Sequence, residues 1–414
     1  MDLAPTAEQD EFRAECRAWL REHLPWEYGK GFPPRFDDLG EEVAFLRTWQ
    51  QKLADARLVG VTWPVDYGGR AAGPLHHFIV QEELARARAP ELVGRIGINL
   101  VGPTLLAHAT PEQRTQWLPK ILRAEELWCQ LFSEPNAGSD LASVSTRAVH
   151  DEAAGGWIVN GQKVWTSYAQ FADWGLCLAR TTPLDEAPID TNRSNDSKSS
   201  PLRSDSHRKH KSISVLVIDM RAPGVEVRPL VQSTGDAEFN EVYFDDVLVP
   251  DDRVIGAVNN GWRVSSSTLT HERGTNPRQL VLHIQLLEEL LKLALESGAY
   301  DDHRLGQRLA QAYVEVRLFQ LHNWRSLSRL EHGRELGPEG SALKLYWSEM
   351  SKRLHDTAMA VLGPASPLWR DAHDNPGDGR WQRSWLYYQS SSIFAGTNEI
   401  QRNIIGERVL GLPR

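Results

Sequence analysis

The stretch Leu131-Phe-Ser-Glu-Pro-Asn-Ala-Gly-Ser-Asp140 marks the point at which the pattern of this 414-residue chain changes. Before it, up to about residue 125, apolar residues recur at helical spacing in segments separated by proline or glycine. From Leu127 to about residue 255, short alternating or apolar runs lie between Gly, Asp, Asn and Pro clusters, which is typical of antiparallel β structure. From Gly261 onward the helical pattern returns. The chain is therefore expected to order its elements as helices, strands and helices again.

This segregated order predicts an α+β fold that is mainly helical, because alternating elements would be needed for a doubly wound sheet. We expect three domains, at residues 1–126, 127–255 and 256–414. Helices are expected at about residues 7–24, 41–58, 74–90, 97–109, 111–123, 280–295, 302–332, 339–362, 381–393 and 397–410. Strands are expected at about residues 127–132, 143–150, 156–159, 174–179, 213–219, 225–230 and 241–244. Thr110 should cap the helix that begins at Pro111. Residues 183–212 are polar and predict a flexible surface insertion.

Composition excludes several classes of protein. With a net charge of −9, overall electrostatics do not suggest a nucleic-acid partner. Cys16, Cys129 and Cys177 are isolated, so we expect neither a disulfide framework nor a metal site. The N-terminus has no apolar signal region, and no run approaches the length of a membrane span. These features predict a cytoplasmic protein without a membrane span.

Three stretches carry residues suited to a site, although each could be structural. In Leu131–Asp140, a Ser- and Gly-rich turn can present backbone N–H groups, and the hydroxyls of Ser133 and Ser139 add donors. In Gly161-Gln-Lys-Val-Trp-Thr-Ser167, Trp165 could lie against a planar cofactor or be buried in the core. In Ile393–Arg402, Gly396 interrupts a helical run and Thr397 could cap the next helix, whose first amides suit a carbonyl or an anion. Neither GxGxxG after a strand nor GxxxxGK[ST] is found.

Taken together, these stretches resemble the acyl-CoA dehydrogenase family, and the resemblance covers residues 7 to 412 apart from the insertion at 183–212. The matching text follows one order along the chain: Tyr67-Gly-Gly69, Ser133-Glu-Pro-Asn-Ala-Gly-Ser-Asp140, Gly161-Gln-Lys-Val-Trp-Thr-Ser167, Asn259-Asn-Gly-Trp262 and Ala395-Gly-Thr-Asn-Glu-Ile-Gln-Arg402. The resemblance implies a helical N-terminal domain, a barrel-like β domain, a C-terminal four-helix bundle and bound FAD. It also implies oxidation of the Cα–Cβ bond of an acyl-CoA to the trans-2-enoyl-CoA.

By the same resemblance, a glutamate removes the α-proton, the β-hydrogen leaves as hydride to flavin N5, and an electron-transfer flavoprotein accepts the electrons. Ser139 would approach the pantetheine arm of the substrate. The residues implied near the cofactor are Gln130, Phe132, Ser133, Trp165, Thr166, Ser167, Gly396, Thr397 and Glu399.

One departure from the family pattern concerns the base. Many members place it directly before the Gly-Thr of the last motif, where this chain has Ala395. The backbone N–H of Ala395, which the family aims at the thioester carbonyl, is unaffected by this change. A minority of members carries the base on the first long helix of the C-terminal domain, before an arginine. That position is Glu272, followed by Arg273, so we expect Glu272 to be the base and Arg273 to orient substrate, hold Glu272 or pair with another acid. A carboxylate buried beside flavin and thioester should have a raised pKa.

Two further departures concern assembly. The family's Arg-x-x-Phe-Gly stretch, which reaches a neighbouring subunit's FAD, is replaced by Asp302-His-Arg-Leu-Gly-Gln-Arg308, and its Gly-Gly-x-Gly turn by Gly363-Pro-Ala-Ser366. These two departures resemble family members that pair with a related, non-identical subunit, and some of those members act on steroid CoA esters. A homotetramer or a heteromer is therefore expected, in fatty acid or steroid side-chain degradation. A silent partner subunit, or a same-fold flavin oxidase acting on another small molecule, stays open.

Overall fold

The computed structural model describes residues 6–29, 36, 38–187, 208–272, 277–334, 337–370 and 372–413, and gives only the backbone at 270–272. The chain divides into two compact units. The helical unit comprises Met1–Arg35, Ala71–Pro90 and Arg273–Arg414. The sheet unit comprises Phe36–Arg70 and Glu91–Glu272. The predicted boundaries at residues 126 and 255 stay a prediction.

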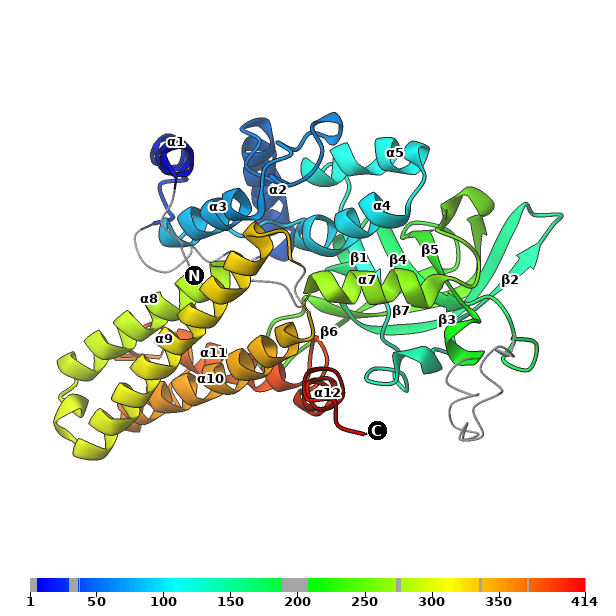
Figure 1. Ribbon diagram of the computed structural model, residues 1–414. Coiled ribbons are helices and arrows are strands. Elements are labelled where there is room, and N and C mark those ends of the chain that lie inside the picture. Colours follow the sequence, from blue (N-terminus) through cyan, green and yellow to red (C-terminus); the bar gives the residue numbers. More distant parts are fainter. Residues whose placement is uncertain are drawn as a thin grey trace. The chain divides into compact units, whose positions relative to one another are not determined.

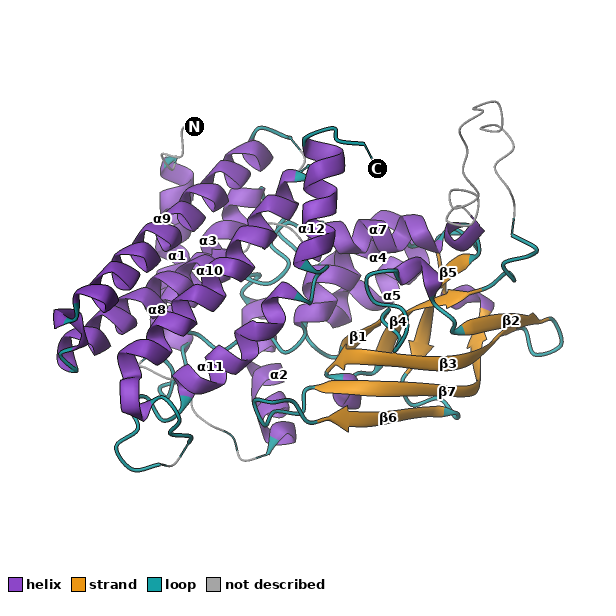
Figure 2. Cartoon of the chain, turned by 90° about the horizontal axis from the view of Figure 1, so that it is seen from below, coloured by secondary structure: helices purple, strands orange, loops and turns teal. Residues whose placement is uncertain are grey.

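The helical unit is built from long amphipathic helices. Its longer helices are α1 (Ala7–His23), α3 (Pro74–Arg86), α8 (Pro277–Glu296), α9 (His303–Glu331), α10 (Glu339–Leu362), α11 (Arg380–Gln389) and α12 (Asn398–Ile404). Figures 1 and 2 show α8, α9 and α10 side by side, and α10 also packs on α11. Their shared core includes Leu290, Val316, Phe319 and Met350. This arrangement agrees with the expected helical bundle, because each helix buries one apolar face against its neighbours.

The sheet unit combines helices with one sheet. Its helices are α2 (Leu39–Asp55), α4 (Gly102–His108), α5 (Pro111–Leu122) and α7 (Gly261–Glu272). Its strands are β1 (Trp128–Leu131), β2 (Arg147–Asp151), β3 (Gly156–Ser167), β4 (Trp174–Arg180), β5 (Ile213–Asp219), β6 (Val225–Leu230), β7 (Phe239–Pro250) and β8 (Val254–Ile255). The strand order is β6-β7-β3-β2-β4-β5-β8, with β1 on β4, and Figure 2 shows β3, β7 and β6 side by side. The mainly helical α+β prediction is confirmed.

The sheet is mixed, which corrects the expectation of a purely antiparallel one. β1 pairs with β4 in parallel, with Cys129 opposite Gly175, and β2 meets β4 in parallel at Arg147 and Arg180. Alternation of apolar residues reports which face of a strand is buried, but it carries no information about the direction of the neighbouring strand. The two-residue strand β8 was also missed, because it is too short to show a period.

Local signals at helix ends were reliable. Thr110 caps α5 through its side chain, Pro111 is the first helical residue, and a capping box with Gln113 completes the start. α7 begins against β5, where a Cβ on Gly261 would come within 2.7 Å of the backbone of Ser214. Buried Thr268 on α7 lies with its Oγ1 2.8 Å from that of Thr104 on α4. These contacts position the helix that ends at Glu272.

The predicted insertion at 183–212 falls largely outside the described residues. In the part of the chain that the structure does describe, no helix is both long enough and apolar enough to cross a membrane.

Candidate functional site

The segment after β1 presents the first group of predicted site residues. Gln130 lies in β1 and is half-buried, Phe132 is buried and Ser133 is half-buried. A tight turn follows, in which Glu134 and Ala137 exchange both backbone hydrogen bonds at 3.0 Å. The turn holds Ser133 next to β3, because the backbone N–H of Val164 donates to the Ser133 carbonyl at 3.0 Å. This hydrogen bond joins the segment to β3.

A buried ion pair fastens these two segments together. The side chain of Lys163 is fully buried, and its Nζ donates to Glu134 Oε1 at 2.7 Å, Leu178 O at 2.7 Å and Phe132 O at 3.2 Å. The carboxylate of Glu134 also accepts from both the backbone N–H and the hydroxyl of Ser145, and from the N–H of Thr146. Burial alone would raise the pKa of Glu134, but the charge of Lys163 and these hydrogen bonds lower it to about 2. The carboxylate of Glu134 is thus charged at neutral pH and accepts hydrogen bonds on both of its oxygens.

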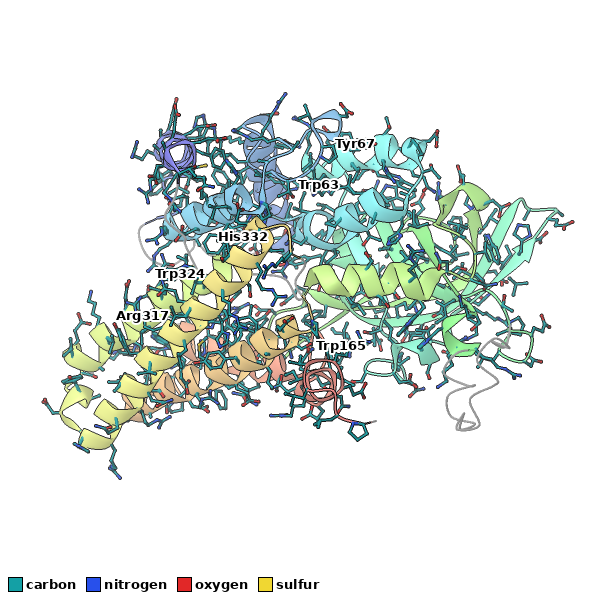
Figure 3. All side chains as sticks on the ribbon, in the orientation of Figure 1. Trp63, Tyr67, Trp165, Arg317, Trp324 and His332 are labelled. Atoms are coloured by element: carbon teal, nitrogen blue, oxygen red, sulfur yellow. The ribbon has the colours of Figure 1, made fainter. Side chains whose placement is uncertain are left out.

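Beyond Lys163, the strand bulges and turns an indole outward. The β3–β7 register shifts between Lys163 and Thr166, and Trp165 adopts a left-handed backbone with φ +61°. Its side chain is 62% exposed and meets Phe239 edge-on at 6.2 Å between ring centroids. Trp165, labelled in Figure 3, therefore supplies the open aromatic surface that the sequence predicted as one of two alternatives. An exposed indole on a rigid strand fits a planar ring system that would cover it.

The neighbours of Trp165 differ in orientation. Thr166 is buried, and its Oγ1 has no hydrogen-bond partner among the described residues, while its carbonyl accepts from Asn240 Nδ2 at 3.0 Å. Ser167 is half-buried. The hydroxyl of Ser167, with that of Ser133, is thus better placed to reach a ligand than the hydroxyl of Thr166.

The last motif forms a tight turn in the helical unit. Ala395 and Gly396 both have left-handed backbones, with φ +54° and +81°. Thr397 caps α12 by accepting from the N–H of Ile400, which confirms its predicted role as an N-cap. Glu399 is exposed, and hydrogen bonds from its own N–H and from Thr397 lower its pKa. Among the described residues, nothing accepts a hydrogen bond from the N–H of Ala395. That donor can therefore serve a ligand.

The predicted base and its neighbour are described least. Glu272 is the last residue of α7, and its side chain lies outside what is described, as does the whole of Arg273. Both assignments remain predictions. Ser139 is described, and it lies exposed in the loop after the Glu134–Ala137 turn. The predicted contact of Ser139 with the pantetheine arm likewise remains a prediction.

The structure thus gathers the predicted residues of β1, its following segment and β3 into one group in the sheet unit, and those of the Ala395 turn into another in the helical unit. Lys163 and Glu134, which tie the first group together, were missed, since a charged residue in a strand usually points to solvent. Gln401, whose Nε2 donates to the carbonyls of Ala395 and Gly396, was missed as well. The only sequence signal for these three was their position inside the matching motifs.

Comparison with known proteins agrees with this arrangement. Three family models match: acyl-CoA dehydrogenase N-terminal domain at residues 6–125, middle domain at 129–194 and C-terminal domain at 259–410. The acyl-CoA dehydrogenase IpdE1 of Mycobacterium tuberculosis is 40% identical over 411 residues, which cover 98% of each chain.

Solved structures match over the full length. The structure titled "Tcur3481-Tcur3483 steroid ACAD" has a TM-score of 0.81 and 28% identity, with 100% of both chains covered. The ChsE4-ChsE5 complex from Mycobacterium tuberculosis has a TM-score of 0.79 and 29% identity, again over 100% of both chains. The family models and the close relative together cover the segments that hold Trp165 and Ala395. This chain is a member of the acyl-CoA dehydrogenase family and an FAD-dependent oxidoreductase.

Proposed function

We propose that the chain dehydrogenates an acyl-CoA thioester between Cα and Cβ, with Glu272 as the base. The observation that carries the assignment is the turn at Ala395, where the side chain cannot take a proton although the backbone N–H is available. Glu272 is the only acid in α7, the helix Gly261–Glu272, and it comes directly before an arginine in the sequence. The base is therefore assigned to α7 and carbonyl polarisation to the turn.

In this proposal each group has a separate task. When bound, FAD supplies the two-electron acceptor to which the β-hydrogen leaves as hydride. Trp165 and the hydroxyls of Ser133 and Ser167 would hold the ring system. The N–H of Ala395 would donate to the thioester carbonyl, which makes the α-proton more acidic by stabilising negative charge on that oxygen. Glu272 would then take this proton.

We further propose a bulky substrate and a second, related subunit. The support is the likeness to a structure titled as a steroid ACAD and to another titled as a complex of two proteins. A second support is Asp302, which takes the place of the family's arginine. Its carboxylate caps α9 by accepting from the N–H groups of Arg304 and Leu305, at 2.7 and 3.3 Å. A side chain used as a helix cap is not available to reach another subunit's cofactor. The electron acceptor in this proposal is an electron-transfer flavoprotein.

The test is anaerobic bleaching of the bound flavin by a panel of acyl-CoAs that runs from straight short chains to steroid side chains. At least one should bleach the wild type, and the bulky ones should do so fastest. Glu272→Gln should keep FAD and lose bleaching by about 10²- to 10⁴-fold. Bleaching at the wild-type rate by Glu272→Gln would refute the base assignment.

The same preparation separates the alternatives. A silent subunit would lack FAD when purified alone and would gain none from added cofactor. A same-fold oxidase would consume oxygen with another small molecule and would not be bleached by any acyl-CoA.

A further inference from the structure

The turn at Ala395 is held in a conformation that its sequence alone does not favour. Two consecutive residues lie in the left-handed region, and the first is an alanine, whose Cβ disfavours that region. Such a conformation persists only where surrounding groups hold it. The direction of the Ala395 N–H depends on the same backbone angles. Whatever holds the turn therefore also aims that donor.

The side chain of Gln401 is hydrogen-bonded to this turn. Gln401 is fully buried, and its Nε2 donates both to the carbonyl of Ala395 at 3.0 Å and to that of Gly396 at 3.1 Å. Its Oε1 has no partner within the described part of the chain. Both hydrogen bonds that the Gln401 side chain makes there thus go to the two residues with left-handed backbones, Ala395 and Gly396.

The helix that carries Gln401 is itself anchored. Asn398, at the start of α12, is buried, and its Oδ1 accepts from Ser348 Oγ at 2.9 Å and from Lys344 Nζ at 3.2 Å. Its Nδ2 donates to Glu349 Oε1 at 2.6 Å. All three partners lie on α10. The contacts run without a break from α10 through α12 to the turn, so the position of the Gln401 amide is determined by the bundle.

We infer that Gln401 is a positioning residue that aims the N–H of Ala395 at the thioester carbonyl. This inference rests on the proposed function, in which that N–H polarises the carbonyl. Gln401 touches neither substrate nor cofactor in this scheme and acts only through the turn. Because the donor must meet charge that develops during the reaction, a small displacement lowers the rate of the chemical step more than it weakens substrate binding.

The test uses Gln401→Met, because methionine has nearly the same length and shape as glutamine but no donor. Gln50 offers a matched control, since it is fully buried and its Nε2 donates to two consecutive carbonyls, Ile121 O and Leu122 O, both at 3.1 Å. Both holoenzymes are reduced anaerobically with the acyl-CoA that bleaches the wild type fastest. The bleaching rate at saturation and the dissociation constant of the substrate are measured separately.

Gln401→Met should bleach about 10- to 100-fold more slowly than the wild type, with the dissociation constant changed less than about 3-fold. Gln50→Met should keep the wild-type rate at saturation, although it too loses stability. A Gln401→Met rate within about 2-fold of wild type would overturn the inference. A similar slowing in both variants would overturn it as well, because the effect would then be one of stability alone.

A crystal structure of Gln401→Met supplies a readout that does not depend on turnover. The φ angles at residues 395 and 396 should leave the left-handed region, and unchanged angles would overturn the holding role. If no acyl-CoA bleaches the wild type, the proposed function fails, and these angles still decide whether Gln401 holds the turn.

Discussion

Replacing Lys163 with methionine should destabilise the sheet unit by about 3–5 kcal/mol, the usual cost of removing one partner of a buried ion pair. The Nζ of Lys163 is fully buried and makes three hydrogen bonds, all of which the substitution removes. Glu134 would keep its bonds from Ser145 and Thr146 but would lose its counter-charge. The carbonyls of Phe132 and Leu178 would each lose a donor as well.

The lowered pKa of Glu134 agrees in direction with this loss, and the hydrogen bonds from Ser145 and Thr146, which the substitution keeps, also contribute to it. In the folded protein the value drops from 4.5 to about 2. At about 1.4 kcal/mol per unit, this corresponds to roughly 3 kcal/mol of stability. Because the folded value is the lower one, this contribution is present above pH 4.5 and is lost as the pH falls toward 2.

Urea unfolding at pH 7, followed by tryptophan fluorescence, measures the loss. Lys120→Met is the matched control, because Lys120 Nζ lies 2.7 Å from Glu126 Oε1 but its side chain is 45% exposed. An exposed pair contributes about 1 kcal/mol or less, so this variant should unfold close to the wild-type midpoint. The double variant Lys163→Met/Glu134→Gln should lose less than the sum of the single losses, by about 2 kcal/mol or more. A coupling below about 0.5 kcal/mol would refute the argument that the two charges stabilise the fold as a pair.

Three further predictions follow from the described geometry. Trp165→Ala should raise the dissociation constant of FAD by about 10- to 100-fold, since a planar cofactor loses an aromatic contact. The urea midpoint should stay nearly unchanged, because that side chain is 62% exposed. Equilibrium dialysis measures the dissociation constant, and an unchanged value would contradict the prediction. In a Glu272→Gln background, Ala395→Glu should recover flavin bleaching by at least about 10-fold if both positions serve the same α-carbon; no recovery, with FAD still bound, would argue against a shared site. Burial lowers the pKa of His283 to about 4 and that of His355 to about 3. Unfolded histidines take up protons below about pH 6.5, so the contribution of these buried neutral histidines to the free energy of unfolding is fully present above that pH. For His283 alone it should fall by on the order of 3 kcal/mol between pH 6.5 and 4. A urea midpoint equal at pH 7.5 and 5 would contradict this prediction.

Features that depend on neighbours in the sequence were predicted well. The caps at Thr110 and Thr397 were expected from residue type, because an N-cap bonds to amides only two or three positions away. The helix at 339–362 and the strands at 213–219 and 225–230 have the expected ends, since each contains a clear apolar period bounded by turn residues. Trp165 shows the limit of this reasoning. From the sequence, Trp165 could be either a core residue or a surface for a cofactor. The register shift in β3 turns its side chain outward, so it is exposed.

Residue identity and spacing alone establish the order of helical and strand segments, the family and the absence of a carboxyl group at residue 395. The tertiary structure decided that β1 and β4 run in parallel and that Lys163 is buried against Glu134. It also decided that Gln401 turns back onto Ala395 and Gly396. Polar side chains such as these can face either water or a buried partner, and the choice depends on which other segments fold against them.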